Sequence, residues 1–169
     1  MMIKKKNIVI IGMPGCGKST CGVLIAKILC KDFVDTDLVI QKNEGASLQS
    51  IIDKKGSDYF AIAEEFAICN LIAENAVIAT GGSAVYSDKA MEYLKENAII
   101  IYLHISFDTM LKRIVNMSDR GILLKNGETI ESMFKEREPL YEKYANIVID
   151  CDGKEIEDTV SEIIRSITI

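Results

Sequence analysis

Residues 12–19 read GMPGCGKS, a complete G-x-x-x-x-G-K-S motif for binding phosphate. A hydrophobic run over residues 7–11 comes directly before it, and an apolar stretch with helical spacing follows over residues 21–29. This order of strand, loop and helix is the context in which the motif binds a nucleotide. The alternative, a chance glycine-rich turn before a helix, does not account for the lysine and serine that follow. The sequence therefore predicts a nucleoside triphosphate site.

The residue types of this loop match the chemistry of a polyphosphate. The glycines of residues 12–17 let the backbone curl so that successive N–H groups point at one anion. The helix that begins near Lys18 adds the positive end of its dipole. We expect Lys18 to reach the β- and γ-phosphates and the Ser19 hydroxyl to bind Mg²⁺.

The composition is typical of one globular domain, which we expect to span residues 1–169. Hydrophobic residues make up 49% of the chain, and no apolar run reaches membrane-spanning length. The N-terminus lacks the pattern of a signal peptide, which favours the cytoplasm. A net charge of −5 argues against a nucleic-acid surface, and we expect a monomer. Five cysteines without metal spacing predict reduced thiols, and a single histidine, His104, excludes a histidine-based triad or zinc site.

Strand-like and helical patterns alternate along the chain, which predicts an α/β fold with a parallel sheet and helices on both faces. The predicted strands are rich in Val and Ile, as expected where both faces of a sheet are covered. They lie at residues 7–11, 33–35, 76–79, 98–103 and 146–150. The predicted helices lie at residues 19–29, 47–53, 57–74, 88–96, 107–115, 129–137 and 155–166. Gly56 breaks the chain between two of them, and Ser57 and Thr129 are expected N-caps.

The stretch 116–127 is polar and punctuated by glycine, and it carries one arginine, Arg120. In an enzyme that transfers phosphoryl groups, such a segment suits a lid that excludes water and brings a cation to the phosphates. The alternative is a plain surface loop.

Two further groups follow predicted strands, where α/β sheets bind their ligands. Asp35 and Asp37 are two residues apart, so along an extended strand end they would project the same way. Asp35 would hold Mg²⁺ beside Ser19, and Asp37 would orient or deprotonate an acceptor hydroxyl, unless it only caps the helix predicted after it. Gly81 and Gly82 would let a ligand approach the backbone closely, or they form a tight turn.

In this order, the segments resemble the shikimate kinase family of small P-loop metabolite kinases. The resemblance runs essentially end to end, and it covers residues 12–20, 35–37, 80–82, the arginine-bearing lid and residues 137–141. It implies a five-stranded parallel sheet of order 2-3-1-4-5, the P-loop NTPase fold. It also implies MgATP as donor and transfer of the γ-phosphate to a ring hydroxyl of shikimate.

The resemblance also assigns roles to single positions. The ATP site implied by it consists of Gly12, Gly15, Cys16, Gly17, Lys18, Ser19, Thr20, Arg113, Arg120 and Lys154. The implied shikimate site consists of Asp37, Gly81, Gly82 and Arg137, with Glu64 helping to hold the pocket together. Lys18, Asp37 and Arg120 would be catalytic, and Ser19 and Asp35 would serve the metal.

Three positions depart from the family pattern: Ala61 stands where the family has an arginine that binds the shikimate carboxylate, Ser83 replaces a third glycine, and Gly121 replaces a proline. Losing a charged hydrogen-bonded pair weakens binding roughly ten- to a hundredfold. Lys54 and Lys55 are the nearby cations that would partly substitute. Three functions therefore stay open: a shikimate kinase, a kinase of the same build with another hydroxylated acceptor, and a nucleotide-binding regulatory module without an acceptor.

Overall fold

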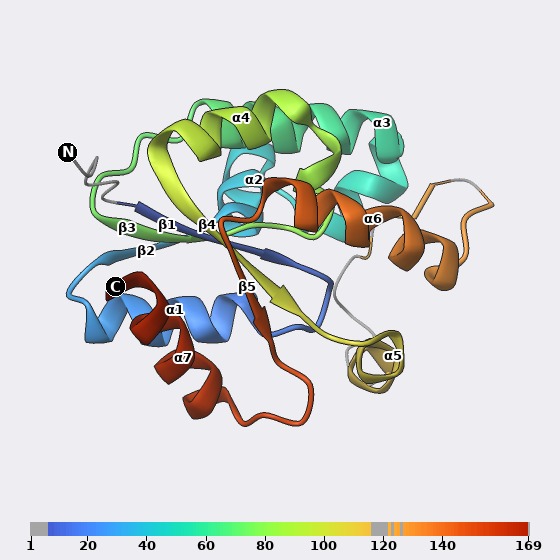
Figure 1. Cartoon of the computed structure of the whole chain (residues 1–169). Coiled ribbons are helices and arrows are strands. Elements are labelled where there is room, and N and C mark those ends of the chain that lie inside the picture. The colour runs from blue at the N-terminus through green and yellow to red at the C-terminus, as the bar shows by residue number, and fades with distance from the viewer. Residues whose placement is uncertain (1–6, 116–121, 123, 126, 169) are drawn as a thin grey trace.

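The computed structural model describes residues 7–115, 122, 124, 125 and 127–168. Their centre is a five-stranded parallel sheet in the order β2-β3-β1-β4-β5, which confirms the predicted topology (Figure 1). The strands are β1 (Asn7–Gly12), β2 (Asp32–Asp35), β3 (Ala76–Ala79), β4 (Ala98–His104) and β5 (Ile147–Asp150). Every residue of β1 is buried, as the run of isoleucine and valine predicts for a central strand covered on both faces.

Helices cover both faces of the sheet and complete three layers. In Figure 1, α1 and α7 pack together below the sheet, whereas α3, α4 and α6 lie above it. The helices are α1 (Lys18–Ile28), α2 (Thr36–Glu44), α3 (Leu48–Cys69), the short 3₁₀ helix η1 (Ala84–Tyr86), α4 (Asp88–Asn97), α5 (Phe107–Val115), α6 (Ile130–Tyr144) and α7 (Ile156–Thr168). Among the described residues, no helix has both the length and the apolar composition needed to cross a bilayer.

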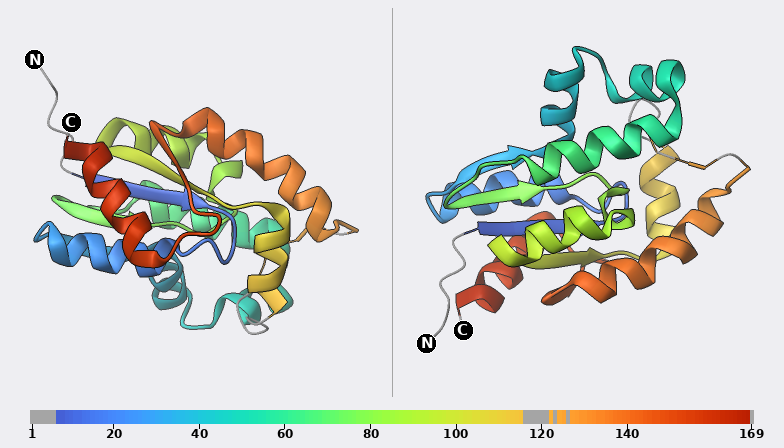
Figure 2. Two further views of the ribbon diagram at one scale, coloured as in Figure 1. Left: turned by 60° about the horizontal axis from the view of Figure 1, so that its bottom comes forward. Right: turned by 90° about the horizontal axis from the view of Figure 1, so that it is seen from above.

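The carboxyl ends of the strands meet at one edge of the sheet. The loop after β1, the end of β2 and the segment after β3 are neighbours there, because Ile10 pairs with Ala79 and Ala79 pairs with Asp35. Both views in Figure 2 place α5 and the first turn of α6 at this same end of the molecule. The fold therefore gathers most of the predicted site segments at one edge.

Two expectations about local structure are wrong. Helix α2 begins at Thr36, so Asp35 rather than Asp37 is its N-cap, and the two carboxylates do not share an extended strand end. The Asp35 carboxylate instead accepts a hydrogen bond from the Asp37 N–H at 2.9 Å. Helix α6 continues seven residues beyond its predicted end at residue 137, through Pro139, since the buried side chains of Tyr141 and Tyr144 extend its apolar face.

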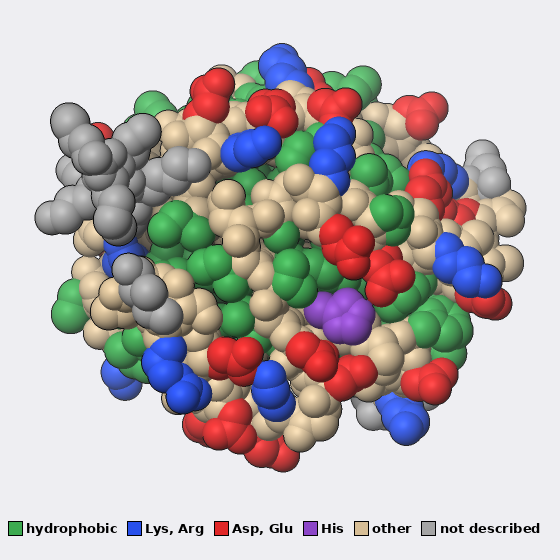
Figure 3. Space-filling model, in the orientation of Figure 1, with side chains coloured by type: hydrophobic (Ala, Val, Ile, Leu, Met, Phe, Trp, Pro, Cys, Tyr) green, Lys and Arg blue, Asp and Glu red, His purple; other side chains and the backbone are tan. Residues whose placement is uncertain are grey.

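Other local signals are confirmed. Gly56 adopts φ 85° and ψ 168° and kinks α3 between the two helices predicted there. Thr129 caps α6 by accepting a hydrogen bond from the Ser132 N–H. All five cysteines are free, and most of them are buried or half-buried. His104 ends β4 near the carboxylates of Glu138 and Asp150, as Figure 3 shows for the purple side chain among red ones.

Candidate active site

The phosphate loop connects β1 to α1 and depends on glycine at its start. Gly12 has φ +148°, and a Cβ there would lie 2.6 Å from the Leu103 carbonyl oxygen of β4. Gly17 is the N-cap of α1, and its backbone adopts the left-handed conformation. Because glycine has no side chain, it makes no capping hydrogen bond. The first N–H groups of α1 therefore have no capping side chain, and they present the positive end of the helix to the loop.

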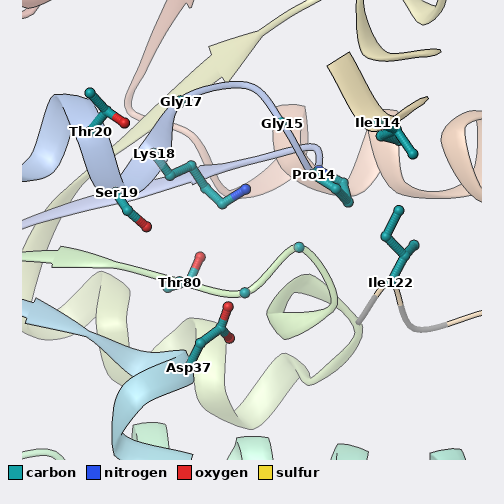
Figure 4. A pocket seen from close by; sticks show the side chains of 12 residues that line it. Pro14, Gly15, Gly17, Lys18, Ser19, Thr20, Asp37, Thr80, Ile114 and Ile122 are labelled. Atoms are coloured by element: carbon teal, nitrogen blue, oxygen red, sulfur yellow. The ribbon is translucent and has the colours of Figure 1, made fainter. Parts of the chain in front are cut away.

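Lys18 lies across this loop. Its ammonium group donates hydrogen bonds to the carbonyl oxygens of Gly12 and Met13, both at 2.8 Å. In Figure 4 the side chain points into the space between the loop and Asp37. Cys16 is buried, and its N–H donates to the Met13 carbonyl at 3.2 Å.

Ser19 and Asp35 are the two residues predicted to bind the metal ion. The Ser19 hydroxyl donates to Oδ2 of Asp35 at 2.8 Å, across from α1 to the end of β2. A hydroxyl and a carboxylate are donors that suit Mg²⁺, which commonly takes its other ligands from substrate phosphates and water. No group of three or more His, Cys, Asp or Glu residues in the described part of the chain could hold a metal by itself. The donor set therefore fits a Mg²⁺ ion that arrives with a nucleotide.

A cleft of about 690 Å³, open to solvent, joins the phosphate loop to the acceptor-side residues (Figure 4). Its lining comes from the loop and α1, from α2, from the segment after β3, and from the apolar side chains of α5 and the stretch after it. The lining residues are Pro14, Gly15, Gly17, Lys18, Ser19, Thr20, Asp37, Thr80, Gly81, Gly82, Ile114 and Ile122.

The two glycines after β3 allow close approach of charged groups. A Cβ on Gly81 would lie 2.6 Å from Oε1 of Glu64 and 2.8 Å from Oδ1 of Asp37. A Cβ on Gly82 would lie 3.0 Å from Nη1 of Arg137. Any larger residue would push these groups apart, so the paired glycines do more than form a turn.

Arg137 is buried, with 1% of its surface exposed, and its Nη1 lies next to Gly82, which lines the cleft. Its Nε donates to the Tyr86 hydroxyl at 3.2 Å, and its guanidinium lies 5.2 Å from the centre of the Tyr86 ring. The Tyr141 hydroxyl donates to the Gly82 carbonyl at 2.6 Å, which ties α6 to the glycine pair. A buried cation this close to the lining of the cleft is suited to bind an anionic ligand group.

Glu64 lies behind the glycines and is 3% exposed. Its Oε2 accepts a hydrogen bond from the Ser83 hydroxyl at 2.6 Å, while its Oε1 has no hydrogen-bond partner among the described residues. Burial raises the pKa of Glu64 to about 7. The charge of Asp37 adds to that rise, and the Ser83 hydrogen bond and the cations Arg137 and Lys18 oppose it. Ser83, which replaces the family's third glycine, thus gives this carboxyl group its hydrogen-bond donor.

We predict that Glu64→Gln removes a pH dependence of stability. A pKa raised from 4.5 to about 7 means that the folded state holds the proton more tightly, so wild-type stability falls as pH rises from about 4.5 to 7. At about 1.4 kcal/mol per pKa unit, the loss is about 3 kcal/mol. Urea denaturation at pH 5 and pH 8 should show this loss in wild type and in Glu65→Gln, but not in Glu64→Gln. An equal loss in Glu64→Gln would contradict the prediction.

The remaining predicted residues are Arg113, Lys154 and Arg120. Arg113 reaches from α5 and donates to the Gly15 carbonyl at 3.0 Å. Lys154 pairs with Glu162 at 2.6 Å and does not line the cleft. Arg120 and Gly121, with most of the predicted lid, lie outside the described residues.

Lys55, one of the two lysines expected to replace the family arginine, is paired with other groups. Ala61 is exposed on α3 and lines a hollow beside Glu64, Ser83 and Tyr86. The Lys55 ammonium donates hydrogen bonds to the Glu44 carboxylate at 2.7 Å and to the Tyr59 hydroxyl at 3.1 Å, so it is already paired away from Ala61. Tyr86 itself was not predicted as a site residue, since a tyrosine three positions after a strand-end loop has no distinguishing local pattern.

Comparison with known proteins now identifies the family. A family model described as shikimate kinase matches residues 14–168. The chain belongs to the shikimate kinase family. It is 36% identical to the shikimate kinase of Sulfurihydrogenibium sp. (strain YO3AOP1), covering 96% of this chain and 98% of the relative, and 34% identical to that of Marinomonas sp. (strain MWYL1), covering 98% and 94%. The structure of shikimate kinase from Acinetobacter baumannii in complex with shikimate matches with a TM-score of 0.86 at 29% identity, covering 96% of this chain and 92% of that one.

Membership in the shikimate kinase family agrees with the geometry of the cleft. The family consists of ATP-dependent phosphotransferases that act on a hydroxyl group, so the chain is an enzyme of this class. This outcome disfavours the regulatory module without an acceptor. The P-loop NTPase fold and the strand order implied by the resemblance are likewise confirmed.

Proposed function

We propose that this protein transfers the γ-phosphoryl group of ATP to a ring hydroxyl of shikimate, with Mg²⁺ as the metal. One observation carries the proposal: a single cleft is lined by the Lys18 phosphate loop, Asp37 and Gly82, and the buried Arg137 lies against Gly82. A phosphate-binding end, a carboxylate and an anion-binding end are the three features that a carboxylated alcohol acceptor requires.

The chemistry is an in-line displacement. The acceptor oxygen forms a bond to the γ-phosphorus as the bond to the bridging oxygen of ADP breaks, and the hydroxyl proton leaves to Asp37 or to water. Lys18 and the N–H groups of α1 stabilise the negative charge on the phosphoryl oxygens. Bound Mg²⁺, held by Ser19 and by Asp35 directly or through water, would neutralise phosphate charge. Most of the rate enhancement would come from positioning and electrostatics.

The other predicted residues take supporting roles in this proposal. The loop residues Gly12, Gly15, Cys16, Gly17 and Thr20, with Arg113 and Lys154, would contact ATP, and Arg120 would approach its phosphates from the stretch 116–127. Gly81 and Gly82 would contact shikimate through the backbone, next to Arg137. We also infer that residues 1–169 act as one domain, as a monomer and in the cytoplasm.

An acceptor panel tests the proposed function. ADP release would be measured with shikimate, gluconate and other polyols and hydroxy acids, each with Mg²⁺ and with excess chelator. We expect shikimate to give a kcat/KM at least about a hundredfold above every other acceptor, because a matched carboxylate and hydroxyl each contribute binding. Chelation should abolish turnover. Preference for a different acceptor would contradict the choice of shikimate and would favour a kinase of the same build with another substrate.

A further inference from the structure

Carboxyl groups lie next to Gly81, and the guanidinium of Arg137 lies next to Gly82. Asp35, Asp37 and Glu64 place three carboxyl groups around the end of β2 and Gly81. A carboxylated acceptor cannot direct its negative charge toward them without repulsion. A carboxylate directed away from them is better placed toward Arg137, whose Nη1 lies next to Gly82.

Tyr86 connects Arg137 to a second cation. Arg137 contacts the hydroxyl of Tyr86, and the Lys125 ammonium lies 4.4 Å from the centre of the same ring. Lys125 comes from the segment just before α6, so two cations from neighbouring parts of the chain meet at one aromatic side chain of η1. Tyr86 also lines the hollow beside Ala61.

Other lysines near this hollow are placed less favourably. Lys55 is committed to Glu44 and Tyr59. Lys89 lies 3.6 Å from Glu65, on the side of the hollow formed by α3 and α4, and its side chain is 74% exposed. Lys125, in contrast, shares the Tyr86 ring with Arg137.

We propose that Lys125 is a specificity-determining residue that binds the acceptor's carboxylate together with Arg137. The proposal rests on the proposed function, since it needs a carboxylated acceptor. Lys125 pairs with Glu136, and their side chains are 55% and 44% exposed. An ion pair this exposed contributes little stability, so exchanging Glu136 for a ligand carboxylate costs little. The flexible stem of lysine allows the ammonium to turn from the Tyr86 ring to the ligand.

Lys125→Ala tests this role with two acceptors, shikimate and its neutral carboxamide. We expect the shikimate KM to rise about tenfold, while kcat and the ATP KM stay within about twofold, because one charged contact to the acceptor is lost. The KM for the carboxamide should not change. Lys125→Arg should keep most of the affinity for shikimate, and adding Ala61→Arg to Lys125→Ala should recover part of it by placing a guanidinium at the hollow.

Lys89→Ala is the matched control, because Lys89 is an exposed lysine whose partner lines the same hollow. It should leave all three constants unchanged. An unchanged shikimate KM in Lys125→Ala, an equal rise for acid and carboxamide, or a rise in Lys89→Ala instead would each overturn the proposal while leaving shikimate kinase activity intact. A wild-type enzyme that does not phosphorylate shikimate would overturn the proposed function itself, and this role of Lys125 with it.

Discussion

Lys18→Ala is expected to lower kcat by about a thousandfold or more in a chain that remains folded. The ammonium lies on the phosphate loop at 2.8 Å from two of its carbonyl oxygens, where it would meet the charge that develops on the phosphoryl oxygens. Loss of one preorganised donor to such charge costs roughly 10²–10³ in kcat, and removal of a full positive charge adds to this. Steady-state turnover with saturating ATP and shikimate measures the effect.

The control is Lys27→Ala, which removes an exposed lysine from the last turn of the same helix. It should keep the wild-type rate. Circular dichroism and urea denaturation should show that Lys18→Ala loses only the modest stability of two hydrogen bonds, about 1–3 kcal/mol. Wild-type turnover in folded Lys18→Ala would refute the role given to Lys18.

Asp37→Asn is expected to lower kcat by about 10²–10³ with little change in the KM for ATP. The amide keeps the shape of the carboxylate but does not attract or accept the proton of the acceptor hydroxyl, a function that contributes 10²–10⁴ in comparable enzymes. The backbone hydrogen bond from Asp37 to Asp35 does not involve the substituted atoms, so the start of α2 should persist. Initial rates over a range of shikimate concentrations separate kcat from KM.

Asp32→Asn provides the comparison, since Asp32 is an exposed carboxylate at the start of β2, the strand that leads into α2. It should behave like wild type. A kcat for Asp37→Asn within twofold of wild type would show that this carboxylate neither orients nor deprotonates the acceptor. An equal loss in Asp32→Asn would point to a general charge effect instead.

The predicted fold was largely right because its signals are local. The run at residues 7–11 is buried along its whole length in β1, and Gly56 and Thr129 act at the positions where the sequence placed a break and a cap. The strand order came from the family resemblance, because hydrophobic patterns do not say which strands become neighbours. The end of α6 was missed, since burial of Tyr141 and Tyr144 outweighs the local signal of Pro139.

The candidate site was predicted less evenly. Lys18 and Ser19 follow from a motif whose spacing carries its chemistry, whereas the finding that Asp35 rather than Asp37 caps α2 depends on where that helix begins. The proposed part played by Lys125 had no local signal. It depends on a tertiary contact, in which Lys125 lies against the ring of Tyr86, nearly forty residues earlier in the chain.

The amino-acid sequence alone specified the phosphate loop and the parallel α/β architecture around it. Eight consecutive residues between a strand and a helix supply the backbone freedom and the charge that a phosphate loop needs. Hydrophobic periodicity is likewise a local property, which can be read from a short segment of the chain. Tertiary packing decided the acceptor side. Glu64 meets Ser83, Arg137 meets Tyr86, and Tyr141 meets Gly82 across 19 to 59 positions. Which charged groups face the substrate therefore depends on how α3, η1 and α6 pack, and no nearby stretch of sequence encodes that.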